Sequence, residues 1–144
     1  MTTAQYVAAI DRLRARAFPV QRGWSDTGPC GPGFHLTTLI SGDAPSGADD
    51  PVAEAVEEAE DQFAAESEAL VAVLDARWGE AQMFSLWSML ARRMEGEEIP
   101  EPWDELCTTV AALHLWKAEG RWIATGAVRG GDRLVAVVTD VDPP

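Results

Sequence analysis

The last third of the chain, residues 111–141, reads AALHLWKAEGRWIATGAVRGGDRLVAVVTDV and constrains the fold more than any other stretch. It holds three runs rich in β-forming residues, separated by KAEG and by GGD. Such runs, with turn residues between them, are typical of neighbouring antiparallel strands. Gly130 and Gly131 suit a primed hairpin turn, in which both central residues need positive φ. The pattern therefore predicts a three-stranded antiparallel meander at the C-terminus.

One further strand is predicted upstream, over residues 34–40. Their sequence, FHLTTLI, is rich in β-branched and aromatic residues and is bounded by turn formers. Residues 20–33 are rich in Gly, Pro, Ser and Asp, and we expect them to form a loop. Residues 95–106 are expected to be a loop or a single turn, because their two prolines prevent regular pairing.

Apolar residues at helical spacing predict the helices. The first runs from Thr2 to near Phe18, and a long one starts at Asp50 and Pro51 and ends at Gly79. AQMFSLWSMLARRM could begin with a short strand, but a helix over residues 84–95 is favoured. Its predicted buried stripe consists of Phe84, Trp87, Leu90 and Met94. The sequence thus predicts a single α+β domain over residues 1–144, in which an antiparallel sheet, the C-terminal three-strand meander plus strand 34–40, packs against two or three helices.

Negative charge is the main departure from an average composition. The formal net charge is −13, and no Lys or Arg occurs between Arg22 and Arg77. A field of this sign repels phosphate backbones and anionic membranes, and it steers basic proteins toward the chain. Direct nucleic-acid binding and membrane binding are therefore disfavoured, and a basic protein partner is favoured. Surplus acid that serves only solubility is the alternative.

Two of the six tryptophans, Trp24 and Trp103, lie in Pro/Gly-rich segments beside acidic residues. A tryptophan within an acidic surface is a frequent anchor of protein interfaces. Alternatively, each of these side chains folds back over the core as a lid. The residues that we expect to bind the partner are Glu57, Glu58, Asp61, Glu97, Glu98, Trp103 and Asp104.

Reactive residues are few. Cys30, with His35 or His114 as its base, is the one combination that would support a small thiol enzyme or a small-ligand pocket. The segment GPCGPG is a poor phosphate cradle, because its prolines lack N–H donors and no Lys follows. No metal-binding spacing and no cofactor motif is present, and no catalytic residue is assigned. A binding protein is favoured over an enzyme.

The two cysteines, Cys30 and Cys107, are expected to remain thiols. Asp11, Arg12 and Arg14 interrupt the only apolar stretch that resembles a secretory signal. No run approaches the ~20 apolar residues of a membrane helix. These observations predict a cytoplasmic protein.

The segments RWGEAQMFSLWSMLARRMEGEEIPEPW and HLWKAEGRWIATGAV resemble a set of small, acidic, uncharacterised proteins of high-GC bacteria. This resemblance implies no activity and no functional residues. In size, acidity and tryptophan-bearing loops the chain also resembles, more loosely, bacterial immunity proteins, which neutralise basic toxin domains. The resemblance implies a toxin-like basic partner. A homodimer formed through a sheet edge is a third hypothesis.

Overall fold

The computed structural model describes residues 3–25, 28–41, 53–128 and 133–143, with the backbone alone for residues 40–41 and 53–60. The elements in chain order are α1 (Thr3–Ala15), β1 (Gly23–Ser25), β2 (Gly28–Gly31), β3 (Phe34–Ser41), α2 (Ala53–Trp78), β4 (Gln82–Ser85), α3 (Trp87–Met94), α4 (Trp103–Thr109), β5 (Ala112–Ala118), β6 (Arg121–Ala127) and β7 (Arg133–Thr139). The predicted α+β class is confirmed.

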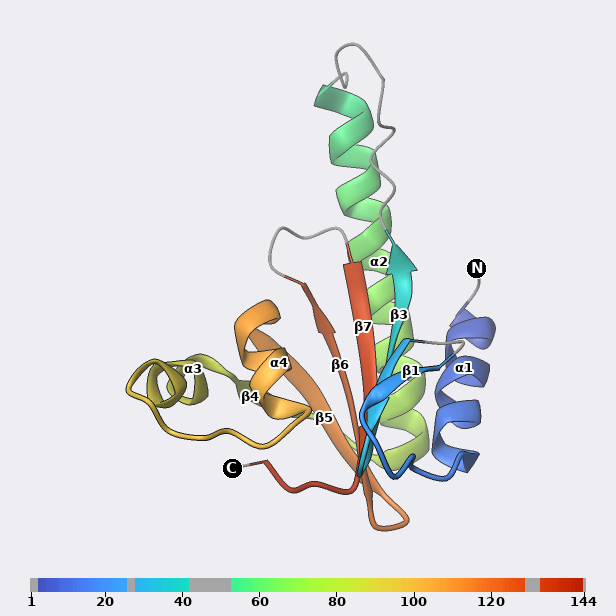
Figure 1. Ribbon diagram of the computed structural model, residues 1–144. Coiled ribbons are helices and arrows are strands. Elements are labelled where there is room, and N and C mark those ends of the chain that lie inside the picture. Colours follow the sequence, from blue (N-terminus) through green and yellow to red (C-terminus); the bar gives the residue numbers. More distant parts are fainter. Residues whose placement is uncertain (1–2, 26–27, 42–52, 129–132, 144) are drawn as a thin grey trace.

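All these strands belong to one antiparallel sheet with the order β1-β2-β3-β7-β6-β5-β4 (Figure 1). The predicted C-terminal meander is confirmed, because β5, β6 and β7 are successive neighbours. The predicted strand 34–40 is β3, which pairs with β7 from Phe34 opposite Thr139 to Ser41 opposite Arg133. The meander and β3 therefore form the centre of the sheet.

A primed turn joins β5 to β6. Glu119 and Gly120 have φ of 54° and 81°, the positive values that such a turn requires at both central residues. The primed turn predicted at Gly130 and Gly131 lies outside the described residues.

The hairpin β1–β2 forms within residues 20–33, where the prediction of a loop was wrong. Its second strand pairs with β3, with Cys30 opposite His35. Gly28 makes the close approach of these strands possible, since a Cβ at this position would lie 2.7 Å from the carbonyl oxygen of Leu36. Glycine and proline favour turns locally, but here pairing with β3 supplies hydrogen bonds to the backbone. Local composition does not reveal that pairing.

The region after α2 differs from the predicted helix over residues 84–95. Gln82–Ser85 pairs with β5 as strand β4, so α3 begins only at Trp87. Residues 103–109 form the helix α4, where a loop or a single turn was expected. Trp103, Leu106 and Val110 of this region are buried at helical spacing, so core contacts stabilise the short helix.

Both faces of the sheet are covered. The helices α1 and α2 lie on one face, and α3 and α4 lie on the other (Figure 1). Strand β7 is accordingly apolar from Leu134 to Val138: Leu134 and Val138 belong to the core beneath α1 and α2, and Val135 and Val137 to the core beneath α3 and α4.

The long helix α2 is buried mainly in its C-terminal half. Leu70 and Leu74 are fully buried there, and the helix ends as predicted at Gly79, whose N–H donates to the carbonyl oxygen of Asp75 at 2.8 Å. Glu66, which interrupts the apolar stripe, accepts a hydrogen bond from the hydroxyl of Tyr6 at 3.3 Å. The N-terminal half extends beyond the end of the sheet (Figure 1).

Candidate functional site

The N-terminal half of α2 is the strongest acidic feature of the structure. Between Ala53 and Ala76 this helix contains no Lys or Arg. From Asp61 to Ala69 its side chains are exposed or half-buried, and Asp61 and Glu68 are exposed. Leu70 is the first fully buried side chain among the described residues of the helix. Among the described side chains, Asp61 in this half and Glu68 farther along the helix therefore present carboxylates to solvent, and no Lys or Arg occurs on the same helix segment.

Glu57 and Glu58 lie in the turn of α2 that precedes Asp61, and their side chains are outside the described residues. Acidic positions 54, 57, 58, 61 and 68 recur at intervals of three, four and seven. In a helix this spacing places positions on one side. Acidic residues near a helix N-terminus also interact favourably with the helix dipole, so the charge is compatible with helix stability.

Glu97, Glu98 and Asp104 form a second acidic group, in the loop after α3 and in the first turn of α4. Glu97 and Glu98 are exposed, and Asp104 is half-buried. Because α3 and α4 cover the opposite face of the sheet from α2, the predicted partner-binding residues form two separate groups. The sequence could not indicate this separation, because it depends on which face each helix covers.

Arginines of α3 compensate part of this second group. Arg92 pairs with Glu97, and Arg93 pairs with Asp104. Glu98 has no ion pair among those between described residues. This group is therefore less strongly negative than the N-terminal half of α2.

Trp103 is not available to a partner, so its assignment as an interface anchor is wrong. Its side chain is 0% exposed within the core beneath α3 and α4, with the ring of Phe84 at 6.2 Å. The indole N–H donates to the carbonyl oxygen of Val141 at 3.0 Å. The alternative, a tryptophan folded over the core, describes Trp103. Trp24, in contrast, is exposed on the edge strand β1.

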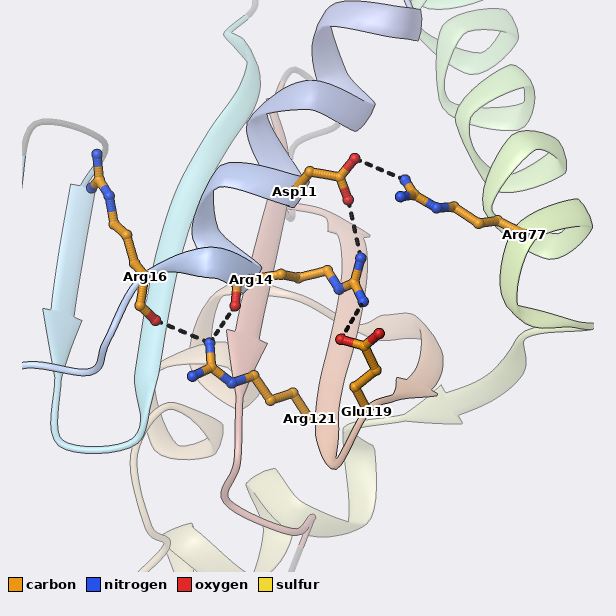
Figure 2. Close-up of polar contacts among 6 residues, drawn as sticks. All are labelled: Asp11, Arg14, Arg16, Arg77, Glu119 and Arg121. Atoms are coloured by element: carbon orange, nitrogen blue, oxygen red, sulfur yellow. Dashed lines mark hydrogen bonds and ion pairs between the residues drawn. The ribbon is translucent and has the colours of Figure 1, made fainter.

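Positive charge gathers at the other end of α2, about 24 Å along the helix from Asp61 if each residue rises 1.5 Å. There the Nη1 of Arg121, on β6, donates to the carbonyl oxygens of Arg14 at 2.7 Å and Arg16 at 3.0 Å (Figure 2). These carbonyls lie at the C-terminal end of α1, where helix carbonyls lack partners. Arg121 thus caps α1.

Asp11 links α1 to α2 in the same cluster. One carboxylate oxygen accepts from Arg14 at 3.1 Å and the other from Arg77 at 2.9 Å (Figure 2). Both guanidinium groups also lie over the ring of Trp78, at 4.9 and 5.2 Å. Glu119 completes the network with an ion pair to Arg14. These arginines hold the fold together at a distance from the acidic end of α2.

The structure brings together only two of the three residues proposed for thiol chemistry. Cys30 and His35 are direct cross-strand partners on β2 and β3. His114 lies on β5, three strand spacings from β3, which corresponds to about 14 Å. It lines a shallow pocket of about 240 Å³ between α2 and β5. A pocket shared by all three residues is therefore ruled out.

The imidazole of His35 is buried, and burial disfavours its charged form. Its Nε2 lies 3.1 Å from the carbonyl oxygen of Ala17, and because a carbonyl only accepts, Nε2 carries the proton. Nδ1 has no hydrogen-bond partner among the described residues, and the thiol of Cys30 lies against the carbonyl of Gly23 instead. Burial lowers the pKa of His35, and the charges of Arg16 and Arg121 lower it further, against the opposing effect of the Ala17 carbonyl.

No three His, Cys, Asp or Glu side chains of the described ranges lie close enough together to hold a metal ion. No described helix has both the length and the hydrophobicity needed to cross a bilayer.

The exposed face of α3 was missed in the sequence, because Trp87 and Met94 were expected in a buried stripe. They are 72% and 78% exposed, and Leu86 and Met89 are buried instead. Phe84 and Leu90 of the predicted stripe are partly buried and pack against the core, so the prediction was wrong for Trp87 and Met94 alone. No local pattern in the sequence marks this difference.

Comparison with known proteins found no match to a family model, to a curated protein or to a solved structure. The resemblance to small acidic bacterial proteins therefore stays a prediction.

Proposed function

We propose that the protein is an acidic protein-binding module of the cytoplasm that binds and neutralises a basic protein, in the manner of an immunity protein or antitoxin. One observation carries the proposal. The N-terminal half of α2 extends beyond the sheet, is acidic, and contains no cation before Arg77.

The distribution of charge explains how such a module would act. The arginines around Asp11 engage helix ends, carboxylates and an aromatic ring, so these arginines do not compensate the distant end of α2. Exposed charges separated by more than about 8–10 Å are screened from one another at physiological salt. A basic partner that approaches the end of α2 therefore meets a local negative field, which accelerates association.

The chemistry of the partner follows from the same field. A protein with clustered Lys and Arg side chains is attracted, whereas nucleic acids and anionic lipids are repelled. Many basic proteins use that charge to bind nucleic acid, and a module of this kind would block such a surface by occupying it. A basic toxin domain has the required properties.

Affinity capture tests the proposal. The immobilised protein is incubated with lysate of its own cells at low salt, and the captured protein is identified by mass spectrometry and purified. We expect a protein of pI above about 9, whose affinity weakens at least tenfold between 50 and 500 mM salt. Capture of no basic protein, or an affinity that salt leaves unchanged, would contradict the proposal.

A matched pair of variants locates the charge that matters. Glu57→Gln/Glu58→Gln removes two charges from α2, and Glu80→Gln/Asp140→Asn removes two exposed charges elsewhere. The first variant is expected to weaken binding of the captured partner at low salt, and the second to leave it nearly unchanged. An equal loss for both would show that only net charge matters.

Thiol chemistry is a second candidate function, supported by the cross-strand pairing of Cys30 with His35 and by the Nδ1 of that histidine, which has no hydrogen-bond partner in the part of the chain that the structure describes. Both side chains are buried, which is unfavourable for a nucleophile that must reach a substrate. Once the partner is identified, the activity of Cys30→Ser is compared with that of the wild type. Equal activity would exclude thiol chemistry as the function.

Dimerisation through an open edge of the sheet, at β1 or β4, is a further proposal about partners. Light scattering over a range of protein concentrations tests it, and a mass of one chain at every concentration would exclude it.

A further inference from the structure

The outward face of α3 is apolar, although this helix lies at the surface. Trp87 and Met94 are seven positions apart, two turns of helix, and are 72% and 78% exposed. Ala91, which lies between them on the same side, is also exposed. Met89, on the other side, is buried in the core. A surface helix normally presents polar residues to water, so an apolar outer face indicates a contact with another molecule.

Both arginines of α3 are already engaged. Arg92 and Arg93 pair with Glu97 and Asp104, which connects the helix to the loop after it and to α4. Burial of Leu86 and Met89 in the core orients α3 so that Trp87 and Met94 are exposed, and the ion pairs add contacts to its neighbours. The exposed pair is therefore part of a positioned element rather than of a loose segment.

The surroundings of this face are negatively charged. From Trp87 to Glu105 the chain has two arginines against six carboxylates, a net charge of −4, and Arg22 offsets one of these carboxylates through its ion pair with Glu101. Glu95 and Glu98 are exposed beside the helix, and Glu97 is exposed as well. An aromatic side chain bordered by charged residues has the arrangement of an interface hot spot, with an apolar centre and a polar rim.

A second copy of the chain is a poor occupant. It would bring another net charge of −13 against the same acidic rim. A stable interface buries about 800 Å² on each side, and at 72% exposure Trp87 supplies roughly 180 Å² of that. Charge complementarity instead favours a basic protein that offers an apolar pocket edged by Lys or Arg.

We propose that the basic partner docks on this face, with Trp87 inserted into an apolar pocket and Met94 against its edge, while the distant acidic end of α2 only steers the approach. This inference rests on the proposed function and deepens it. The two acidic groups, on opposite faces of the sheet, thereby have different roles: the α2 group sets the association rate, and the α3 face sets the lifetime of the complex.

Two synthetic peptides of equal charge serve as the probes. One is an amphipathic helical peptide of Leu and Lys, and in the other each Leu is replaced by Ser. Binding of each labelled peptide is followed by fluorescence anisotropy at 50 and 300 mM salt. The protein variants are Trp87→Ser/Met94→Ser and, as the matched control, Trp24→Ser, which removes another exposed tryptophan at the far edge of the sheet.

We expect the wild type to bind the Leu/Lys peptide at least tenfold more tightly than the Ser/Lys peptide. Trp87→Ser/Met94→Ser removes this difference and leaves binding of the Ser/Lys peptide unchanged, and Trp24→Ser behaves as the wild type does. All variants should retain the wild-type circular dichroism spectrum, since the replaced side chains are exposed.

Two results separate the possible failures. Salt-dependent binding of both peptides with no preference for Leu, or an equal loss in Trp24→Ser, would overturn the α3 docking face and leave the proposed function standing. Failure of the wild type to bind either peptide in a salt-dependent way would overturn the proposed function and the docking face together.

Discussion

Replacing Trp103 with Phe is predicted to destabilise the fold and to leave partner binding unchanged. The side chain is 0% exposed and packs against Phe84, so its removal acts on the core. Truncation of a buried tryptophan to Ala costs about 3–5 kcal/mol. Phe keeps one aromatic ring, so the loss from the cavity is smaller, about 1 kcal/mol. Loss of the indole bond to the carbonyl of Val141 adds about 1–2 kcal/mol.

The expected total is about 2–3 kcal/mol in the free energy of unfolding, or a fall of roughly 5–10 °C in Tm for a chain of this length. Urea unfolding followed by circular dichroism measures it. Trp87→Phe is the control, because that side chain is largely exposed, and it should change the free energy of unfolding by less than about 0.5 kcal/mol.

Three outcomes would refute this reasoning. Two concern stability: a Trp103→Phe protein that is as stable as the wild type, and a Trp87→Phe protein that loses as much stability as was expected for Trp103→Phe. The third is a folded Trp103→Phe protein that binds the basic partner tenfold more weakly, which would restore Trp103 as an interface anchor.

Three further predictions concern stability. Arg121→Met should lower the free energy of unfolding by about 2 kcal/mol, because two charge-assisted hydrogen bonds to the end of α1 are lost. Arg121→Lys should restore only part of this loss, and chemical denaturation measures both variants. Gly126→Ala should destabilise by at least about 1–2 kcal/mol, since the new Cβ would lie 2.7 Å from a methyl group of Val110; a Tm equal to that of the wild type would argue against this packing. The pKa of His35 is lowered in the folded protein. The neutral imidazole therefore contributes fully to the free energy of unfolding above pH 6.5, the ordinary pKa of histidine, and this contribution declines as the pH falls below 6.5. Relative to His35→Gln, the wild type should therefore lose stability between pH 7 and pH 5, and a constant difference in urea unfolding across this range would contradict a neutral buried imidazole.

Local patterns predicted the parts of the fold that local interactions determine. The meander, strand β3 and the long helix α2 with its end at Gly79 followed from turn residues, β-branched runs and capping signals. The hairpin β1–β2 did not, because its stability depends on pairing with β3 and its composition favours a loop. Strand β4 was similarly underestimated, and Trp87 and Met94 were wrongly placed in the buried stripe, whereas Phe84 and Leu90 of that stripe do pack against the core.

The candidate site was predicted less completely than the fold. The acidity of α2 could be read directly from the sequence, whereas the separation of Glu97 and Glu98 from Asp61 depends on tertiary arrangement. The burial of Trp103 did leave a signal that was overlooked. Residues 103, 106, 107 and 110 are all apolar at helical spacing, which is typical of a helix packed on a core.

The most direct test of the role of the α2 charge is the association rate constant with the captured partner. It is measured between 50 and 500 mM salt for the wild type and for Glu57→Gln/Glu58→Gln, and it shows whether the charge of α2 accelerates association. The account predicts that the wild-type rate falls at least tenfold over this range and that the variant starts from a lower rate at low salt and falls less steeply. A wild-type rate that is independent of salt, or a variant that follows the wild-type curve, would contradict it.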